Sequence, residues 1–83
     1  MFKYQFLFPE TGEITESSYK YKSPETACRG ARAFMKEVIK YGERRKDEEA
    51  RLKIIEEGGK LKIDSGKASV ESILSWLTGY RVP

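Results

Sequence analysis

The chain has 83 residues, of which 39% are hydrophobic, 35% charged and 12% aromatic, and its net charge is +3. A chain this short cannot build two independent cores, and its composition is too apolar for disorder and too charged for a membrane span. It contains no His and one Cys, which excludes Ser-His-Asp and Cys-His catalysis, His-ligated metal sites and an internal disulfide. We therefore expect one small cytoplasmic domain over residues 1–83, without a membrane partner.

Residues 1–8 alternate between apolar and polar side chains, which predicts a strand with one apolar face. That face carries four aromatic residues: Phe2, Tyr4, Phe6 and Phe8. The segment from Pro9 to Gly12 predicts a chain reversal, because Pro suits the second position of a turn and Gly readily takes a positive φ. A second strand is expected over residues 13–22.

Pairing Phe8 with Glu13 extends the aromatic face onto the second strand. The side chains that it adds are those of Thr15, Ser17, Tyr19 and Tyr21. We interpret this face as the core beneath a helix. The alternative is a platform on which single-stranded nucleic acid stacks its bases.

A helix is predicted to begin after Ser23, since Ser is a good N-cap, Pro24 suits the first helical position and Glu25 complements the helix dipole. Its apolar residues recur at spacings of three and four and predict a stripe that faces the core. The stripe consists of Ala27, Ala31, Phe34, Val38 and Tyr41, flanked by Met35 and Ile39. Gly30 allows close packing, and we interpret Cys28 as a small buried hydrophobe.

Residues 50–64 allow two interpretations. Helix propensity favours a helix over residues 47–57 that ends at Gly58. The apolar pattern favours a hairpin in which Gly58 and Gly59 form a two-residue turn. The side chains that would then face the same side are Leu52 and Ile54 on one strand and Leu61 and Ile63 on the other. We expect the hairpin.

The last predicted element is a helix after Ser69, which suits the N-cap position, with Gly79 just beyond its end. Val70, Ile73, Leu74 and Leu77 form its apolar stripe. Trp76 and Tyr80 lie at the edge of this stripe. They complete the rim of the core or form a small exposed patch that contacts a protein partner.

These elements predict an α+β fold of the order ββαββα. It is a two-layer sandwich in which a small antiparallel sheet carries both helices on one face. The alternative order is ββααβα, with residues 47–57 helical.

Turn and cap residues recur within residues 12–30, namely Gly12-Glu13-Ile14, Ser17-Ser18, Tyr21, Ser23, Ala27 and Gly30. With these residues the chain resembles the repeat unit of the YegP-like family of small bacterial domains. The resemblance implies a hairpin followed by one helix, and it implies no biochemical activity.

The positive charge is concentrated in one part of the chain. Residues 29–53 carry nine Lys and Arg against five Asp and Glu, a net charge of +4, and the rest of the chain has a net charge of −1. At 100° per residue, one arc of the first helix holds a basic ridge, which Arg44 extends if the helix continues. The basic ridge consists of Arg29, Arg32, Lys36, Lys40 and Arg44. It is a solvated helix face or a surface that follows nucleic-acid phosphates.

No motif predicts an enzyme or a cofactor. Gly66-Lys67-Ala68-Ser69 precedes a helix but lacks the glycine spacing of a phosphate-binding loop; Lys67 and the free amides of the helix start suggest at most a weak anion site. We expect a small non-enzymatic interaction module, of bacterial or phage accessory type, that binds or inhibits a protein partner through a sheet edge or through Trp76 and Tyr80. The alternative is nucleic-acid binding along the basic ridge. An edge strand also offers a route to a homodimer.

Overall fold

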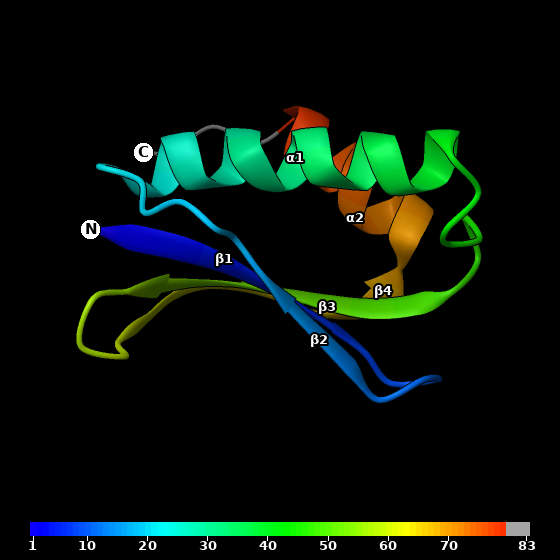
Figure 1. Ribbon diagram of the computed structural model, residues 1–83, viewed down its shortest axis with the longest axis horizontal. Coiled ribbons are helices and arrows are strands. Elements are labelled where there is room, and N and C mark those ends of the chain that lie inside the picture. The colour runs from blue at the N-terminus through cyan, green and yellow to red at the C-terminus, as the bar shows by residue number, and fades with distance from the viewer. Residues whose placement is uncertain (80–83) are drawn as a thin grey trace.

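The computed structural model describes residues 1–79, and it contains a four-stranded antiparallel sheet with both helices on one face (Figure 1). In chain order the elements are β1 (Phe2–Phe8), β2 (Glu13–Glu16), α1 (Pro24–Lys40), β3 (Glu49–Glu56), β4 (Leu61–Ser69) and α2 (Val70–Gly79). The strand order across the sheet is β2-β1-β3-β4. This is the predicted α+β fold of the order ββαββα, and the alternative with residues 47–57 helical is wrong.

The β1 strand lies in the middle of the fold because one of its faces is aromatic. Tyr4, Phe6 and Phe8 are buried beneath α1, and the Phe6 ring lies 5.3 Å from the ring of Phe34 on that helix. The first hairpin has the predicted register, with Phe8 opposite Glu13. The aromatic face of β1 is therefore core and cannot serve as a base-stacking platform.

The second strand is shorter than predicted, because the ladder breaks after Glu16. The backbone N–H of Tyr4 donates to the Ser17 hydroxyl instead of to a carbonyl, and that hydroxyl donates to the carbonyl of Tyr19. The chain then bulges outward and returns where Tyr21 pairs with Phe2. Tyr21 packs against the core, whereas the prediction for Tyr19 is wrong, since its side chain is exposed.

The α1 helix begins where its sequence predicts. Ser23 is the N-cap, its hydroxyl accepts from the Thr26 N–H, and the Thr26 hydroxyl in turn accepts from the Ser23 N–H. The buried residues of the helix are Ala27, Cys28, Ala31, Met35 and Val38. Tyr41 is the C-cap residue and its side chain is exposed, so its predicted place in the core is wrong.

The β3–β4 hairpin places Ala50, Leu52 and Ile54 in the core. Ile54 pairs with Ile63 as the predicted register requires, but the register then shifts, and Ile55 pairs with Leu61. This bulge turns Leu61 to the outer face of the sheet, where its side chain is exposed. The predicted two-residue turn is wrong, because the Glu56 N–H donates to the Lys60 carbonyl and three residues lie between them. Gly58 and Gly59 both take the positive φ expected of turn glycines.

The α2 helix covers the other half of the sheet, against β3 and β4. Its buried residues are Val70, Ile73 and Leu77, and Leu74 packs partly against the core. The Ser69 hydroxyl accepts from the Ser72 N–H, as expected of an N-cap. Gly79 is still helical and does not take a positive φ, so it is not the predicted C-terminal cap.

Candidate functional site

The basic ridge follows the side of α1 that points away from the sheet, and the structure divides its predicted members. Arg29 forms an ion pair with Glu25, one turn earlier, with 2.9 Å between Arg29 Nη2 and Glu25 Oε1. Arg32, Lys36 and Lys40 have no carboxylate oxygen of residues 1–79 within ion-pair distance. No carboxylate of the described residues therefore pairs with these three side chains.

Arg44 is not part of the basic ridge, because α1 ends at Lys40 and the chain turns inward. The Arg44 side chain is only 11% exposed and binds two carboxylates, Glu13 at 2.6 Å and Glu48 at 2.9 Å from its terminal nitrogens. Its guanidinium also lies over the Phe8 ring, 3.8 Å from the ring centre. Arg44 is thus a structural cation that ties the loop after α1 to the β1–β2 hairpin.

A hollow of about 330 Å³ lies between α1 and α2, beside the basic ridge. Ile39 and Leu74 are its apolar walls, and Lys36, Lys40, Lys46 and Glu71 are its charged ones. Lys46 reaches this place because its carbonyl accepts from the Glu71 N–H, which fixes the loop against the start of α2. Sequence reasoning missed Lys46, since only the docking of this loop on α2 brings it to the ridge.

Trp76 borders a second hollow, of about 250 Å³, between α2 and the edge strand β4. The hollow is lined by Asp64, Ser65, Ala68, Ser72, Ile73 and Trp76. Trp76 is 37% exposed, so it lies at the edge of the core and also reaches the surface. The structure thus places Trp76 beside one of the predicted sheet edges, whereas Tyr80 lies outside the described residues.

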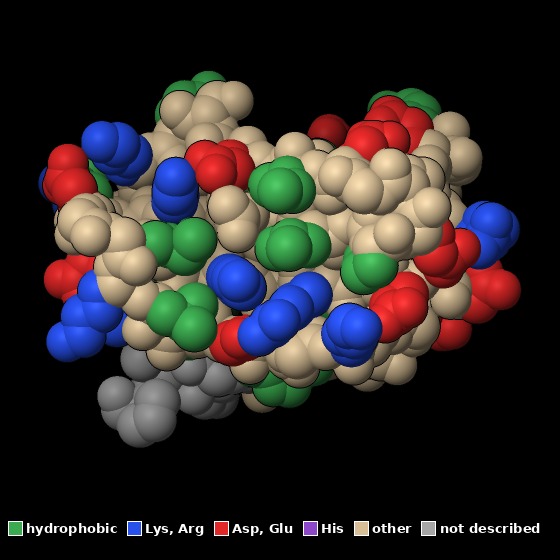
Figure 2. Space-filling view, turned by 90° about the horizontal axis from the view of Figure 1, so that it is seen from below, with side chains coloured by type: hydrophobic (Ala, Val, Ile, Leu, Met, Phe, Trp, Pro, Cys, Tyr) green, Lys and Arg blue, Asp and Glu red, His purple; other side chains and the backbone are tan. Residues whose placement is uncertain are grey.

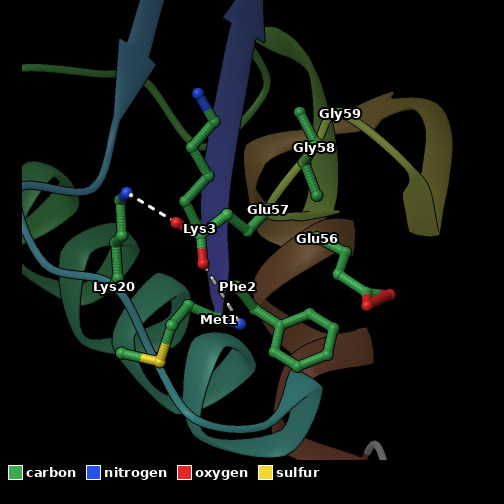
Figure 3. A pocket seen from close by; sticks show the side chains of 9 residues that line it. Met1, Phe2, Lys3, Lys20, Glu56, Glu57, Gly58 and Gly59 are labelled. Atoms are coloured by element: carbon green, nitrogen blue, oxygen red, sulfur yellow. Dashed lines mark hydrogen bonds and ion pairs between the residues drawn. The ribbon is translucent and has the colours of Figure 1, made fainter.

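A third hollow, of about 330 Å³, lies where β1 begins and the β3–β4 hairpin turns (Figure 3). Glu57 crosses it and pairs with the Met1 amino group and with Lys20. Its other charged residues, Lys3 and Glu56, also have ion-pair partners. Because these charges already neutralise one another, the hollow offers no unbalanced charge to a ligand.

The face of the sheet opposite the helices is uncovered within residues 1–79. Figure 2 shows this face, with hydrophobic side chains at the surface between Lys and Arg. Two cross-strand pairs supply apolar side chains here, Ile14 with Leu7 and Leu61 with Ile55. Ile14 is 61% exposed and Leu61 is 48% exposed, so both ends of the face present apolar surface to solvent.

Most charges on this open sheet face are paired with a neighbour. The Lys3 amine lies 2.8 Å from a Glu16 oxygen, and Arg51 forms an ion pair with Asp64. The Arg51 bond, with a further bond from the Gly66 N–H, lowers the pKa of the Asp64 carboxyl to about 2. The carboxylate is therefore fixed in its charged, paired form at neutral pH.

Two groups that the sequence singled out, the Cys28 thiol and the first amides of α2, have structural roles. Burial, and secondarily the charge of Glu25, raises the pKa of the Cys28 thiol to about 11, which makes it a poor nucleophile. The first amides of α2 are occupied, because the Val70 N–H donates to Glu48 and the Glu71 N–H to Lys46. The anion site predicted near Lys67 is therefore wrong.

Residues 1–79 contain no group of three or more Cys, Asp and Glu side chains placed to hold a metal ion. No helix in this part of the chain is long and apolar enough to cross a membrane.

No family model, curated protein or solved structure matches this chain. The resemblance of residues 12–30 to the YegP-like repeat unit stays a prediction.

Proposed function

We propose that the protein is a small non-enzymatic interaction module that binds a protein partner through the open face of its sheet. The observation that carries this proposal is the exposure of Ile14 and Leu61 on a face that neither helix of residues 1–79 covers. Antiparallel sheets commonly have one solvated face, and such a face is usually polar. Ile14 beside Leu7 and Leu61 beside Ile55 form two apolar spots on it, each with one exposed side chain, and such spots are surface that a partner protein can bury.

The energetic argument begins with the apolar pairs. Fully burying a Leu or Ile side chain contributes about 1.5–3 kcal/mol, and most of that contribution is still available at Ile14 and roughly half of it at Leu61. The partly covered Leu7 and Ile55 beside them widen each contact. Burial of these two anchors by a partner therefore favours binding.

The charges between the anchors favour a protein over a polyanion. Lys3 pairs with Glu16 and Arg51 pairs with Asp64 across neighbouring strands, so these four charges offer little attraction to phosphates. A partner that covers this part of the face buries ion pairs that are already formed. Removing water from a paired charge costs less free energy than removing it from an unpaired one. The absence of His from the whole sequence also supports a role in binding and not in catalysis.

Site-specific photo-crosslinking tests the proposal. A benzophenone amino acid is placed at Ile14 or Leu61 on the open sheet face, and at Ala33 on the exposed side of α1 as the matched control. Illumination in the native host should join the same protein to positions 14 and 61 and not to position 33.

Each result of the crosslinking experiment either supports the proposal or overturns it. Crosslinking of one partner from Ile14 and Leu61 supports the proposal, and purified partner then allows the affinity to be measured. Equal yields from all three positions, or none from the sheet positions, would overturn it. Crosslinks between two copies of the chain, with a dimer in light scattering, would replace the separate partner by a homodimer.

A further inference from the structure

The cations beside the hollow between α1 and α2 differ from most others in the molecule, because they have no carboxylate partner. Lys3, Lys20, Arg29, Arg44, Arg45, Arg51, Lys62 and Lys67 all have carboxylate partners. Arg32, Lys36, Lys40 and Lys46 have none within residues 1–79, and they lie on one side of the molecule. Four cations without a carboxylate partner therefore lie along this side, which we call the cationic face.

The geometry of the cationic face suits an extended polyanion. Arg32, Lys36 and Lys40 succeed one another every four residues, which is about 6 Å along a helix, so the row spans about 12 Å. Lys36, Lys40 and Lys46 also line one hollow, so Lys46 adds a fourth cation beside the row. Glu71 is the one carboxylate among the residues that line this hollow.

An exposed aromatic ring stands at the end of the row. Tyr41 is 67% exposed, and the Lys40 amine lies 5.5 Å from its ring centre. The Tyr41 N–H donates to the Glu37 carbonyl at the end of α1. This bond holds the backbone of Tyr41 in place, while its ring is exposed to solvent. Rings placed beside cations are the means by which single-stranded nucleic acids are held, since bases stack on the ring while cations follow the phosphates.

We propose that the cationic face binds single-stranded nucleic acid, with phosphates at Arg32, Lys36, Lys40 and Lys46 and one base stacked on Tyr41. This activity goes beyond the proposed protein contact, because it uses the helix layer and leaves the open sheet face free. The row recognises backbone charge and a ring face, so binding is tolerant of sequence. An acidic protein segment would use the same charges but has no base to stack on the ring.

Fluorescence anisotropy with a twelve-nucleotide oligothymidylate tests the proposal across a tenfold range of NaCl concentration. Four phosphate contacts give a slope of log K against log salt of about −2.8 for a single strand. The double variant Lys36→Gln/Lys40→Gln should halve that slope. Lys53→Gln/Lys60→Gln is the matched control, since it removes two other unpaired lysines, and it should leave the slope nearly unchanged.

Two further variants separate stacking from charge. Tyr41→Ala should weaken binding at least fivefold, the lower bound for losing one stacked base, while Tyr19→Ala, at another exposed tyrosine, should not. Glu71→Gln should strengthen binding, because it removes the carboxylate from the hollow. Equal losses in the control variants, or no binding at low salt, would overturn the proposal. Polyglutamate that competes as well as the oligonucleotide, with Tyr41 unimportant, would assign the face to an acidic protein instead.

Discussion

Replacing Arg44 by Ala removes a guanidinium that three parts of the fold share. It pairs with Glu13 on β2 and with Glu48 in the loop before β3, and it lies over the ring of Phe8 on β1. The Glu48 side chain is only 7% exposed, so its carboxylate would stay away from water after its partner is lost. We therefore expect Arg44→Ala to be the most destabilising substitution of a charged residue among residues 1–79.

The three contacts of Arg44 contribute unequally to the free energy of unfolding. Breaking a buried pair by removing one partner costs about 3–5 kcal/mol, whereas the largely exposed Glu13 contributes less than about 1 kcal/mol. Losing the cation over Phe8 adds about 0.5–2 kcal/mol. Because these contributions overlap, we expect a loss of about 3–5 kcal/mol, from a total that is about 4–12 kcal/mol for a chain of this length.

Urea denaturation followed by circular dichroism measures this loss. Arg29→Ala is the matched control, because its pair with Glu25 is exposed and contributes about 0.3–0.5 kcal/mol. If Arg44→Ala does not fold, Arg44→Met/Glu48→Met keeps the volume without the buried charge and should recover most of the stability. A loss at Arg44 no greater than that at Arg29 would refute the assignment of Arg44 to the structural interior.

Three further predictions concern packing, reactivity and pH. A methyl group at Gly30 would overlap the Tyr21 hydroxyl and ring. Displacing that ring costs about 1–3 kcal/mol, which is partly offset by about 1 kcal/mol because Ala favours the interior of α1 over Gly. Gly30→Ala should therefore destabilise the wild type slightly and stabilise a Tyr21→Ala protein by about 1 kcal/mol. Cys28, with its pKa raised to about 11, should react with a thiol reagent at pH 8 far more slowly in the native protein than in urea. Asp64, with its pKa lowered from 3.8 to about 2, stabilises the fold above pH about 4, and this contribution is lost as pH falls toward 2; Asp64→Asn should flatten that acid decline, and an unchanged decline would count against the Arg51 pair.

Local signals predicted much of the fold. The alternating aromatics of β1 identified the buried face, the pairing of Phe8 with Glu13 fixed the first register, and Ser23 with Pro24 located the start of α1. Each of these depends on neighbours in sequence or on a period of two or three to four residues. The hairpin at residues 49–69 was the harder prediction, since helix propensity opposed the apolar pattern and tertiary burial decided it.

The wrong predictions share a cause. A periodic pattern of apolar residues does not reveal where the backbone departs from a regular strand or helix. Two inserted residues expose Tyr19, a shifted pair exposes Leu61, and the end of α1 exposes Tyr41. Arg44 looked like one more step of the basic ridge, but the loop carries it inward to Glu48. Lys46 could be added to the cationic face only after the packing of its loop against α2 was known, because no sequence period links it to Lys36.

The central claim is that a partner protein covers the open sheet face. Isothermal titration calorimetry of the crosslinked partner against the wild type, Ile14→Glu, Leu61→Glu and Ala33→Glu tests it most directly. We predict a loss of affinity of at least tenfold for each sheet variant, none for Ala33→Glu, and a negative heat-capacity change for the wild type, since apolar surface is buried. Unchanged affinity in folded Ile14→Glu and Leu61→Glu proteins would contradict the claim.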